Sequence, residues 1–215
     1  MKKFAFILLC CLACTLELSA QKFAGMINRT TVYETYQPAR ITLTTGRVIM
    51  QKEANVFLKN ARLLFKKGRL DMEANMAQIR AVEFADKSYV RLDTMLAVVT
   101  DTLGNNRVLC TTTIDLAAFT NREINDRIIS NFEIGTEQVS MASLDMVALE
   151  DKEYPLVNNY YFEVNGKILE ANERTITRHL NRSKRSRLEF YLQMPDFDWG
   201  NPEWQHKVLE LFEKK

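Results

Sequence analysis

The sequence predicts an α+β protein in which an N-terminal antiparallel β meander, a small barrel or sandwich, precedes a β-hairpin with two to three C-terminal helices. Three observations favour this fold class. Short runs between residues 39 and 114 alternate apolar and polar residues, which is typical of strands with one buried face. Turn residues separate these runs at short intervals. Near the C-terminus, apolar residues instead recur at helical spacing.

The predicted strands follow one another with a turn between each pair. They comprise Ala39 to Leu43, Arg47 to Met50, a strand through Val56 and Leu58, Ala61 to Lys66, strands through Leu70 and Met72, Val82 and Phe84, and Val90 and Leu92, then Met95 to Thr100 and Arg107 to Ile114. Residues 75–79 are expected to form a single helical turn. Residues 103–106, Leu-Gly-Asn-Asn, predict a hairpin loop between the last two strands. Strands of this length and spacing favour an antiparallel sheet. The β domain is therefore predicted to cover residues 21–115.

Residues 116–159 form a less regular connecting region. One helix is predicted in it from four apolar residues at helical spacing, Ile124, Ile128, Ile129 and Phe132, with Gly135 as a natural end. The alternation between residues 136 and 150 is incomplete, so this segment receives no assignment.

Residues 160–215 are predicted to form a hairpin and helices that pack on the β domain. The hairpin is indicated by Asn165-Gly166, because both central residues of the tight turn need positive φ. We expect Asn172 to cap a first helix and Ser183 to start a second, which ends before Pro195.

The last helix has the clearest sequence pattern. Asn201 is expected to be its N-cap, and Pro202 occupies the first turn. Its apolar face is predicted to consist of Trp204, Val208, Leu211 and Phe212.

The first 20 residues are predicted to be a signal peptide. Lys2 and Lys3 precede an uncharged, mostly apolar run of 13 residues, from Phe4 to Leu16. A membrane-spanning helix needs roughly 17–25 residues, so no transmembrane helix is expected in the mature chain. We expect cleavage after Ala20 and a location in the periplasm or outer envelope. The alternative is a lipoprotein lipidated at Cys14.

Charge and cysteine content limit the partners and the chemistry. The net charge is +2, and loss of Lys2, Lys3 and Glu17 with the leader makes it +1. A nearly neutral chain gives no reason to expect nucleic acid as a partner. Three of the four cysteines lie in the leader, so no internal disulfide can form. Cys110 lies in a strand-like run and is expected to be a buried core thiol.

Known catalytic motifs are missing from the sequence. It contains no glycine-rich phosphate loop, no Gly-x-Ser-x-Gly elbow and no His-Glu-x-x-His helix. His179 and His206 are its only histidines. We therefore expect no enzyme activity, no cofactor and no metal site. Asp93 and Asp101 flank one predicted strand and could approach one another, but such pairs are expected by chance among 27 acidic residues, so we base no glycosidase on them. A carboxylate-based hydrolase of unfamiliar type is kept as an alternative.

Residues 196–201 have the beginning of a calcium-loop pattern. An EF-hand loop needs glycine at its sixth position and glutamate at its twelfth, but Asn201 and Lys207 occupy these places. We interpret the segment as a connection between helices, with Asn201 as a cap.

Basic residues cluster near the predicted C-terminal helices. They are Arg174, Arg178, His179, Arg182, Lys184, Arg185 and Arg187. On one helix, i, i+4 spacing would align Arg174, Arg178 and Arg182 in a stripe. With Arg185, these residues are candidate contacts for an anionic lipid or glycan. A solvated surface balanced by nearby glutamates is the alternative.

Trp199 is the best-placed aromatic residue for a ligand contact, because it lies on a predicted loop. Tryptophan also fills the ends of small cores, which is the alternative interpretation.

Several segments resemble a known group of proteins. They are Tyr160-Tyr161-Phe162-Glu163-Val164-Asn165-Gly166-Lys167, the paired helices ending in Glu203-Trp204 to Phe212, and the leader end Ser19-Ala20-Gln21. Together they resemble uncharacterised exported proteins of Bacteroidetes. Asp93-Thr94-Met95 and Asp101-Thr102-Leu103 are similar to the O-glycosylation acceptor of that group. The resemblance implies an envelope location and brings no activity.

The sequence therefore favours an exported envelope protein that binds another envelope protein or assists assembly. The basic cluster keeps an anionic envelope component open as an alternative ligand, and the oligomeric state is left open.

Overall fold

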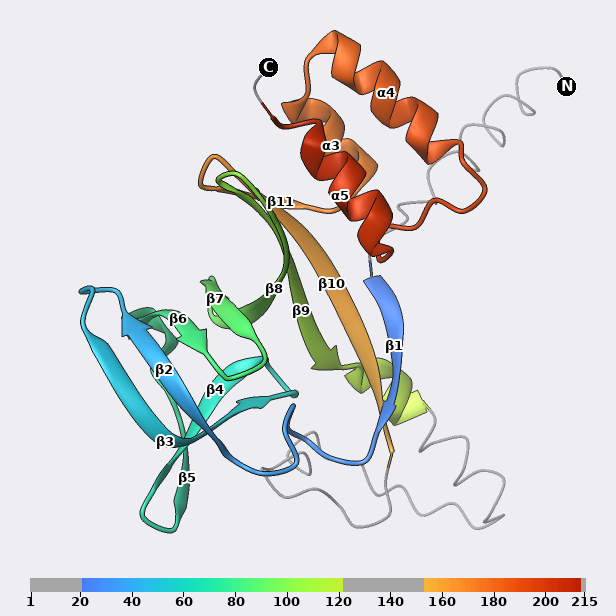
Figure 1. Cartoon of the computed structure of the whole chain (residues 1–215). Coiled ribbons are helices and arrows are strands. Elements are labelled where there is room, and N and C mark those ends of the chain that lie inside the picture. The colour runs from blue at the N-terminus through green and yellow to red at the C-terminus, as the bar shows by residue number, and fades with distance from the viewer. Residues whose placement is uncertain (1–20, 122–152, 214–215) are drawn as a thin grey trace, which may run out of the picture.

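The computed structural model describes residues 21–121 and 153–213, which form one antiparallel sheet and a group of C-terminal helices (Figure 1). The α+β class is confirmed. The strands are β1 (Gln21–Ile27), β2 (Gln37–Leu43), β3 (Val48–Phe57), β4 (Arg62–Lys67), β5 (Leu70–Glu73), β6 (Ile79–Glu83), β7 (Ser88–Leu92), β8 (Met95–Leu103), β9 (Asn106–Ile114), β10 (Tyr154–Val164) and β11 (Lys167–Glu170). The predicted leader with Cys14 and the predicted helix over 124–132 lie outside the described residues.

The strands pair in the order β1-β10-β9-β8-β7-β6-β2-β3-β4-β5, which is the order of an open sheet. Strand β11 pairs with β10 as well, beyond the stretch of β10 that pairs with β1. Strand β1 is not predicted by the sequence pattern. Its register shifts between Phe23 and Gly25, and such a bulge interrupts the alternation by which a strand is found in a sequence.

Two strands are longer than predicted. Strand β3 is continuous, although the sequence predicts two strands, because its polar residues 51–53 stay in the extended strand instead of turning. Strand β10 begins at Tyr154 rather than at Tyr160. The polar residues 158–159 lie within the strand, and the hydroxyl of Thr112 on β9 donates to Asn158 Oδ1 at 2.6 Å. The single helical turn predicted over 75–79 is confirmed as η1 (Met76–Gln78).

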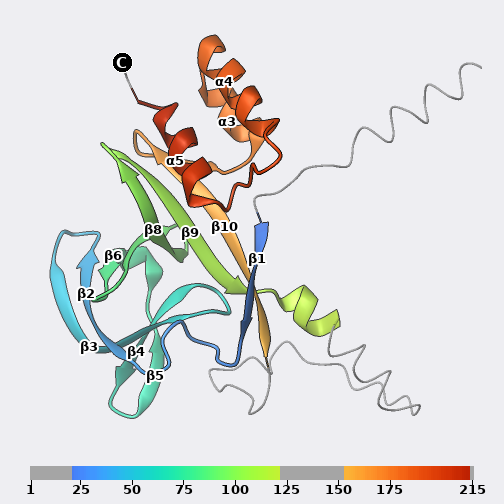
Figure 2. The same cartoon turned by 45° about the vertical axis from the view of Figure 1, so that its right-hand side comes forward.

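Strands β2 to β7 curl into what we call the curled half of the molecule (Figure 2). The amide of Leu96 at the start of β8 donates to the carbonyl of Ala61 beside β4, at 2.7 Å. The curl encloses a core whose buried residues are Ala39, Ile41, Ala54, Val56, Leu63, Met76, Ile79, Val82, Phe84, Tyr89 and Leu96. The ring of Phe84 contacts two tyrosine rings here. Its centroid lies 4.8 Å from that of Tyr33 and 5.8 Å from that of Tyr89.

Three helices follow β11: α3 (Glu173–His179), α4 (Arg182–Leu192) and α5 (Pro202–Glu210). The predicted caps Asn172 and Asn201 are confirmed, since each side chain accepts a backbone N–H from the first turn. The predicted start of the second helix at Ser183 is wrong. Asn181 is the N-cap, and its Oδ1 accepts from the amide of Lys184 at 3.0 Å.

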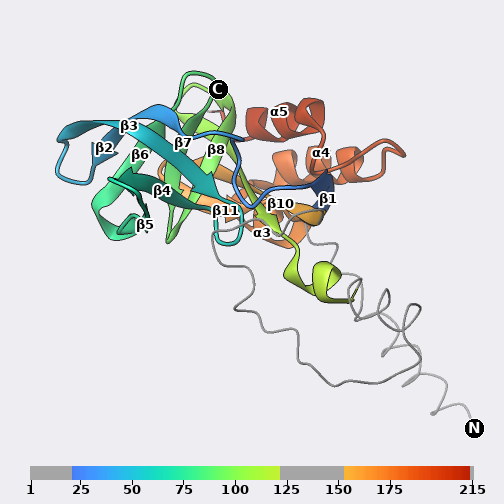
Figure 3. The ribbon, with the colours of Figure 1, turned by 90° about the horizontal axis from the view of Figure 1, so that it is seen from below.

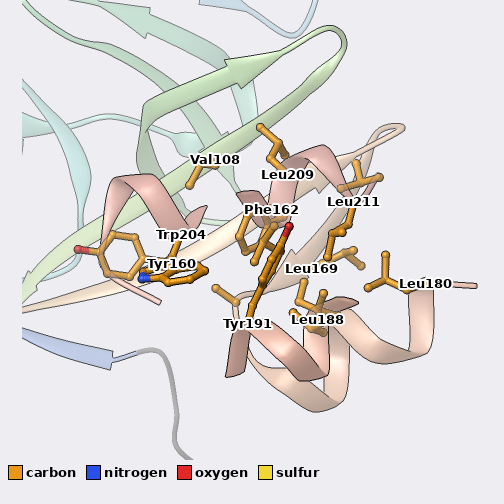
Figure 4. Packing of buried hydrophobic residues seen from close by; sticks show 14 of the residues in the cluster. Val108, Tyr160, Phe162, Leu169, Leu180, Leu188, Tyr191, Trp204, Leu209 and Leu211 are labelled. Atoms are coloured by element: carbon orange, nitrogen blue, oxygen red, sulfur yellow. The ribbon is translucent and has the colours of Figure 1, made fainter. Parts of the chain in front are cut away.

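These helices lie at the opposite end of the molecule from the curled half (Figure 3). We call strands β8 to β11 together with α3, α4 and α5 the helical half. Helix α5 packs against β8 and β9, and α3 contacts β11. Figure 4 shows the core between them, in which Phe162 from β10 is fully buried among side chains from α4 and α5.

The hairpin between β10 and β11 has the predicted turn. Asn165 and Gly166 adopt φ values of 49° and 77°, which matches the positive φ at both centres of a type I′ turn. The turn places Lys167 and the rest of β11 beside α3.

Cys110 is a core residue, as predicted. It is 5% exposed, and burial raises the pKa of its thiol to about 11. A thiol with this pKa stays protonated at neutral pH and is a poor nucleophile. Cys110 is the free cysteine of the described residues, which contain no disulfide.

Candidate binding groove between two helices

A groove open to solvent runs between α4 and α5, with a cavity volume of about 630 Å³. Its lining consists of Arg187, Phe190 and Tyr191 from α4 and of Glu203, Trp204, His206, Lys207 and Glu210 from α5. This volume lies within the range of ligand-binding clefts.

The floor of the groove is aromatic. Tyr191 and Trp204 are buried, and their ring centroids are 5.5 Å apart. The indole N–H of Trp204 donates to the carbonyl of Asp196 at 3.0 Å, which fixes the ring. Phe190 is 58% exposed beside them, and leaving this side chain in water forgoes on the order of 1–2 kcal/mol of burial energy.

Both signs of charge surround this floor. The ammonium of Lys207 lies 3.9 Å from the centroid of the Trp204 ring, and the guanidinium of Arg187 lies 5.8 Å from that of Tyr191. These are cation–π distances. Glu203 and Glu210 provide negative charge along the same groove. The groove therefore combines an apolar floor with a polar, mixed-charge rim.

His206 ties the groove to the sheet. Its Nδ1 lies 2.7 Å from Asp101 Oδ2 on β8, and its Nε2 lies 3.8 Å from Glu210 Oε1. The hydrogen bond with Asp101 raises the pKa of His206, because the carboxylate stabilises the protonated imidazole. The pair orients α5 on β8, so we assign His206 a structural role.

The predicted basic stripe on one helix is wrong. Helix α3 ends at His179, and α4 starts at Arg182 after Leu180 and Asn181. The four candidate arginines are all exposed, with Arg174 and Arg178 on α3 and Arg182 and Arg185 on α4. The break arises because the Asn181 side chain caps the new helix, and it separates the arginines into two pairs.

Arg185 has a structural partner. Its Nε donates to the carbonyl of Leu180 at 2.8 Å, and this carbonyl belongs to the C-cap residue of α3. Satisfying a helix-terminal carbonyl in this way stabilises the corner between the two helices.

Trp199 completes the aromatic core. It is half-buried, with its ring centroid 5.1 Å from that of Phe197 and 6.4 Å from that of Phe162. Its carbonyl accepts a hydrogen bond from Gln205 at 2.7 Å. The structure therefore places Trp199 at the edge of the core rather than in the groove.

Asp93 and Asp101, which flank one predicted strand, do not come together. Asp93 precedes β8 and Asp101 lies near its other end, so about eight residues of strand, on the order of 25 Å, separate them. Within residues 21–121 and 153–213, no group of three or more His, Cys, Asp or Glu side chains is placed to hold a metal. In residues 196–201, Asp198 accepts from the amide of Gly200 and Asn201 caps α5, as predicted for a helix connection.

The groove itself is not predicted by the sequence pattern. Its signal was Phe190, which lies about 200° around the helix from the buried Leu188 and therefore off the buried face. Comparison with models of known families, with curated proteins and with solved structures finds no match for this chain. No helix in the described ranges is both long and apolar enough to cross a membrane.

Proposed function

We propose that this protein is an exported, non-enzymatic envelope protein that binds another envelope protein through the groove between α4 and α5. The observation that carries the proposal is the exposed Phe190 beside an aromatic floor. An apolar side chain of the partner would cover Phe190 and recover its burial energy.

The composition of the groove favours a protein as its occupant. Protein interfaces combine an apolar centre with a polar rim, and aromatic residues and arginine are enriched in them. Tyr191 and Trp204 supply the centre, while Arg187, Glu203 and Lys207 supply the rim. A rim that carries both signs of charge suits a protein surface better than an anionic polymer.

The non-enzymatic part of the proposal draws on the placement of the titratable residues. His206 is bonded to Asp101, and His179 Nδ1 lies 2.9 Å from the carbonyl of Thr175. The separation of Asp93 from Asp101 gives the hydrolase alternative no support.

The envelope location draws on the sequence of the leader. A short apolar run behind two lysines favours export, with cleavage after Ala20 or, in the alternative, lipidation at Cys14. The resemblance to exported Bacteroidetes proteins is consistent with this location and stays a proposal.

Cross-linking in intact cells followed by pull-down tests the function. Phe190→Asp places a charge on the apolar floor, so we expect the cross-linked partner to be lost. Leu70→Asp is the matched control, because Leu70 is 66% exposed on β5 in the curled half. An equal yield of partner from both variants and from the unchanged protein would contradict the proposal.

A second candidate function is binding of an anionic lipid or glycan by exposed arginines. The observation that favours it is that Arg178 and Arg182 are exposed and form no ion pair with another described residue. Binding to anionic vesicles should then fall steeply with added salt. Unchanged binding after Arg178→Glu with Arg182→Glu would exclude this function.

We also propose that the curled half closes as a small barrel. The support is the Leu96 to Ala61 hydrogen bond, which links strands that are far apart in the sheet order. Slow hydrogen exchange of the Leu96 amide is the expected result, and exchange as fast as in a loop would contradict it.

A further inference from the structure

A second hollow, of about 350 Å³, lies where the β10–β11 hairpin, the corner between α3 and α4, and the end of α5 meet. Its lining consists of Val164, Asn165, Lys167, Leu169, His179, Leu180, Asn181, Lys184, Leu211 and Phe212. It shares none of these residues with the groove between α4 and α5.

Three basic side chains from three separate elements line this hollow. Lys167 comes from the hairpin, His179 from the last turn of α3, and Lys184 from the first turn of α4. None of the described residues that line it is an aspartate or a glutamate. The hollow is therefore positively charged without a carboxylate in its own wall, unlike the mixed-charge groove.

The hydrogen bonds of Lys184 and His179 leave part of each polar group open to a further partner. Lys184 Nζ donates to the backbone carbonyl of Glu213 at 2.8 Å, which is a neutral acceptor and leaves two more N–H groups on the ammonium. His179 Nδ1 lies 2.9 Å from the carbonyl of Thr175. Because a carbonyl only accepts, Nδ1 carries the hydrogen, and Nε2 is left for a second partner.

Apart from Asn165 and Asn181, the remaining wall is apolar. Leu169, Leu180 and Leu211 are buried, with 4%, 4% and 3% of their surface exposed. Phe212, which also lines the hollow, is half-buried. Figure 4 shows these three leucines at one end of the helical core. An occupant would therefore meet Phe212 and the edges of these leucines on one side and the lysine ammonium groups on the other.

We propose that this hollow binds an organic phosphate monoester with a small apolar substituent. A phosphate monoester carries a charge of about −1.5 to −2 at neutral pH, which suits the two lysines, because their ammonium groups can donate to its oxygens. The leucines and Phe212 would contact the apolar substituent. A free alkyl phosphate and a phosphatidic acid headgroup share this chemistry.

Titration calorimetry on the purified protein tests the proposal with hexyl phosphate, inorganic phosphate and hexanol. We expect hexyl phosphate to bind more tightly than either of the other probes, because inorganic phosphate lacks the apolar chain and hexanol lacks the phosphate. Vesicles of phosphatidylcholine with and without phosphatidic acid then identify the source. Binding of both hexyl phosphate and the phosphatidic acid vesicles would indicate a lipid headgroup. Binding of hexyl phosphate alone would indicate a free ligand.

Charge removal assigns the binding to the hollow. Lys167→Gln with Lys184→Gln should weaken hexyl phosphate binding about tenfold or more, since each lost charge-assisted bond is a large part of the affinity of a small ligand. Lys167→Gln alone, at an exposed hairpin position, should weaken it several-fold with the circular dichroism spectrum unchanged. Lys52→Gln with Lys67→Gln is the matched control, because both lysines are exposed on β3 and β4 of the curled half, and it should leave the binding unchanged. No binding of hexyl phosphate, or equal binding by Lys167→Gln and the unchanged protein, would overturn the proposal.

Discussion

The curled half and the helical half bury their apolar residues in different ways. In the curled half, the apolar residues lie on one face of a curled sheet, whose neighbouring strands are joined by backbone hydrogen bonds. In the helical half, separate helices cover the sheet, and the core consists of side chains that the helices and the sheet bring together. Both hollows described above lie in the helical half. Helices that cross at a corner leave space at their ends, whereas paired strands lie at a fixed spacing of roughly 5 Å.

The two halves nevertheless share strands. Leu96 and Val98 on β8 contact the core of the curled half, and Val98 also packs against the core of the helical half. This continuity predicts that the halves lose their structure together, although each has its own core.

The largest expected effect follows from Phe162→Ala. Removing this fully buried ring should lower the free energy of unfolding by about 3–5 kcal/mol. Both tryptophans, Trp199 and Trp204, lie in the helical half, so their fluorescence reports on that half alone. In urea, fluorescence and far-ultraviolet circular dichroism should change in one coincident transition.

Leu63→Ala is the matched variant in the curled half, where Leu63 is 1% exposed. It should lower the stability by about 2–5 kcal/mol and shift the tryptophan transition to lower urea as well. A tryptophan transition that stays in place in this variant would show that the halves unfold independently.

A smaller effect is expected at the corner between α3 and α4. Arg185→Gln removes the bond to the Leu180 carbonyl and should cost about 1 kcal/mol of stability. Arg178→Gln, at an exposed position on α3, is the control and should change stability by less than about 0.5 kcal/mol. Equal stability of the two variants in urea unfolding would contradict the structural role of Arg185 and leave it a candidate ligand contact.

The N-cap of α5 offers a test of similar size. The Asn201 side chain accepts the amide of Glu203 at 2.9 Å, so Asn201→Ala should cost about 1 kcal/mol. Asn201→Asp keeps a capping oxygen and should retain most of the stability. If thermal unfolding does not separate the two variants, the cap contributes nothing.

The smallest effect concerns pH. Because the pKa of His206 is raised in the folded protein by its bond to Asp101, the bond stabilises the fold fully at pH below the unfolded-state value of 6.5. This contribution is lost as the pH rises through the folded-state pKa. His206 is 45% exposed, so the effect is small. Melting temperatures from about pH 5 to about pH 9 should show a weaker dependence in His206→Gln; an identical profile would argue against the bond.

Local patterns predicted those elements that depend on local chemistry. The Asn165-Gly166 turn, the caps Asn172 and Asn201, and the core position of Cys110 all follow from a few neighbouring residues. The sequence pattern failed at two other features, which a search for alternation and helical spacing does not detect. The bulge at Gly25 interrupts the alternation that would have predicted β1. The cap at Asn181 begins a new helix, which separates the arginines of the expected basic stripe.

The two hollows were beyond prediction for a related reason. Lys167, His179 and Lys184 come together only because the hairpin and the α3–α4 corner pack on the same core. Phe190 could have been noticed as an aromatic residue off the buried face of α4, but its neighbours on α5 depend on how the helices cross.

The central claim is that the partner contacts the helical half at Phe190. A photo-reactive amino acid at position 190 or at position 70, irradiated in intact cells, tests it most directly, since both native side chains are exposed and apolar. We predict a covalent adduct of one discrete mass from position 190 and none from position 70. Absence of an adduct at position 190, or the same adduct from both positions, would contradict the proposed function.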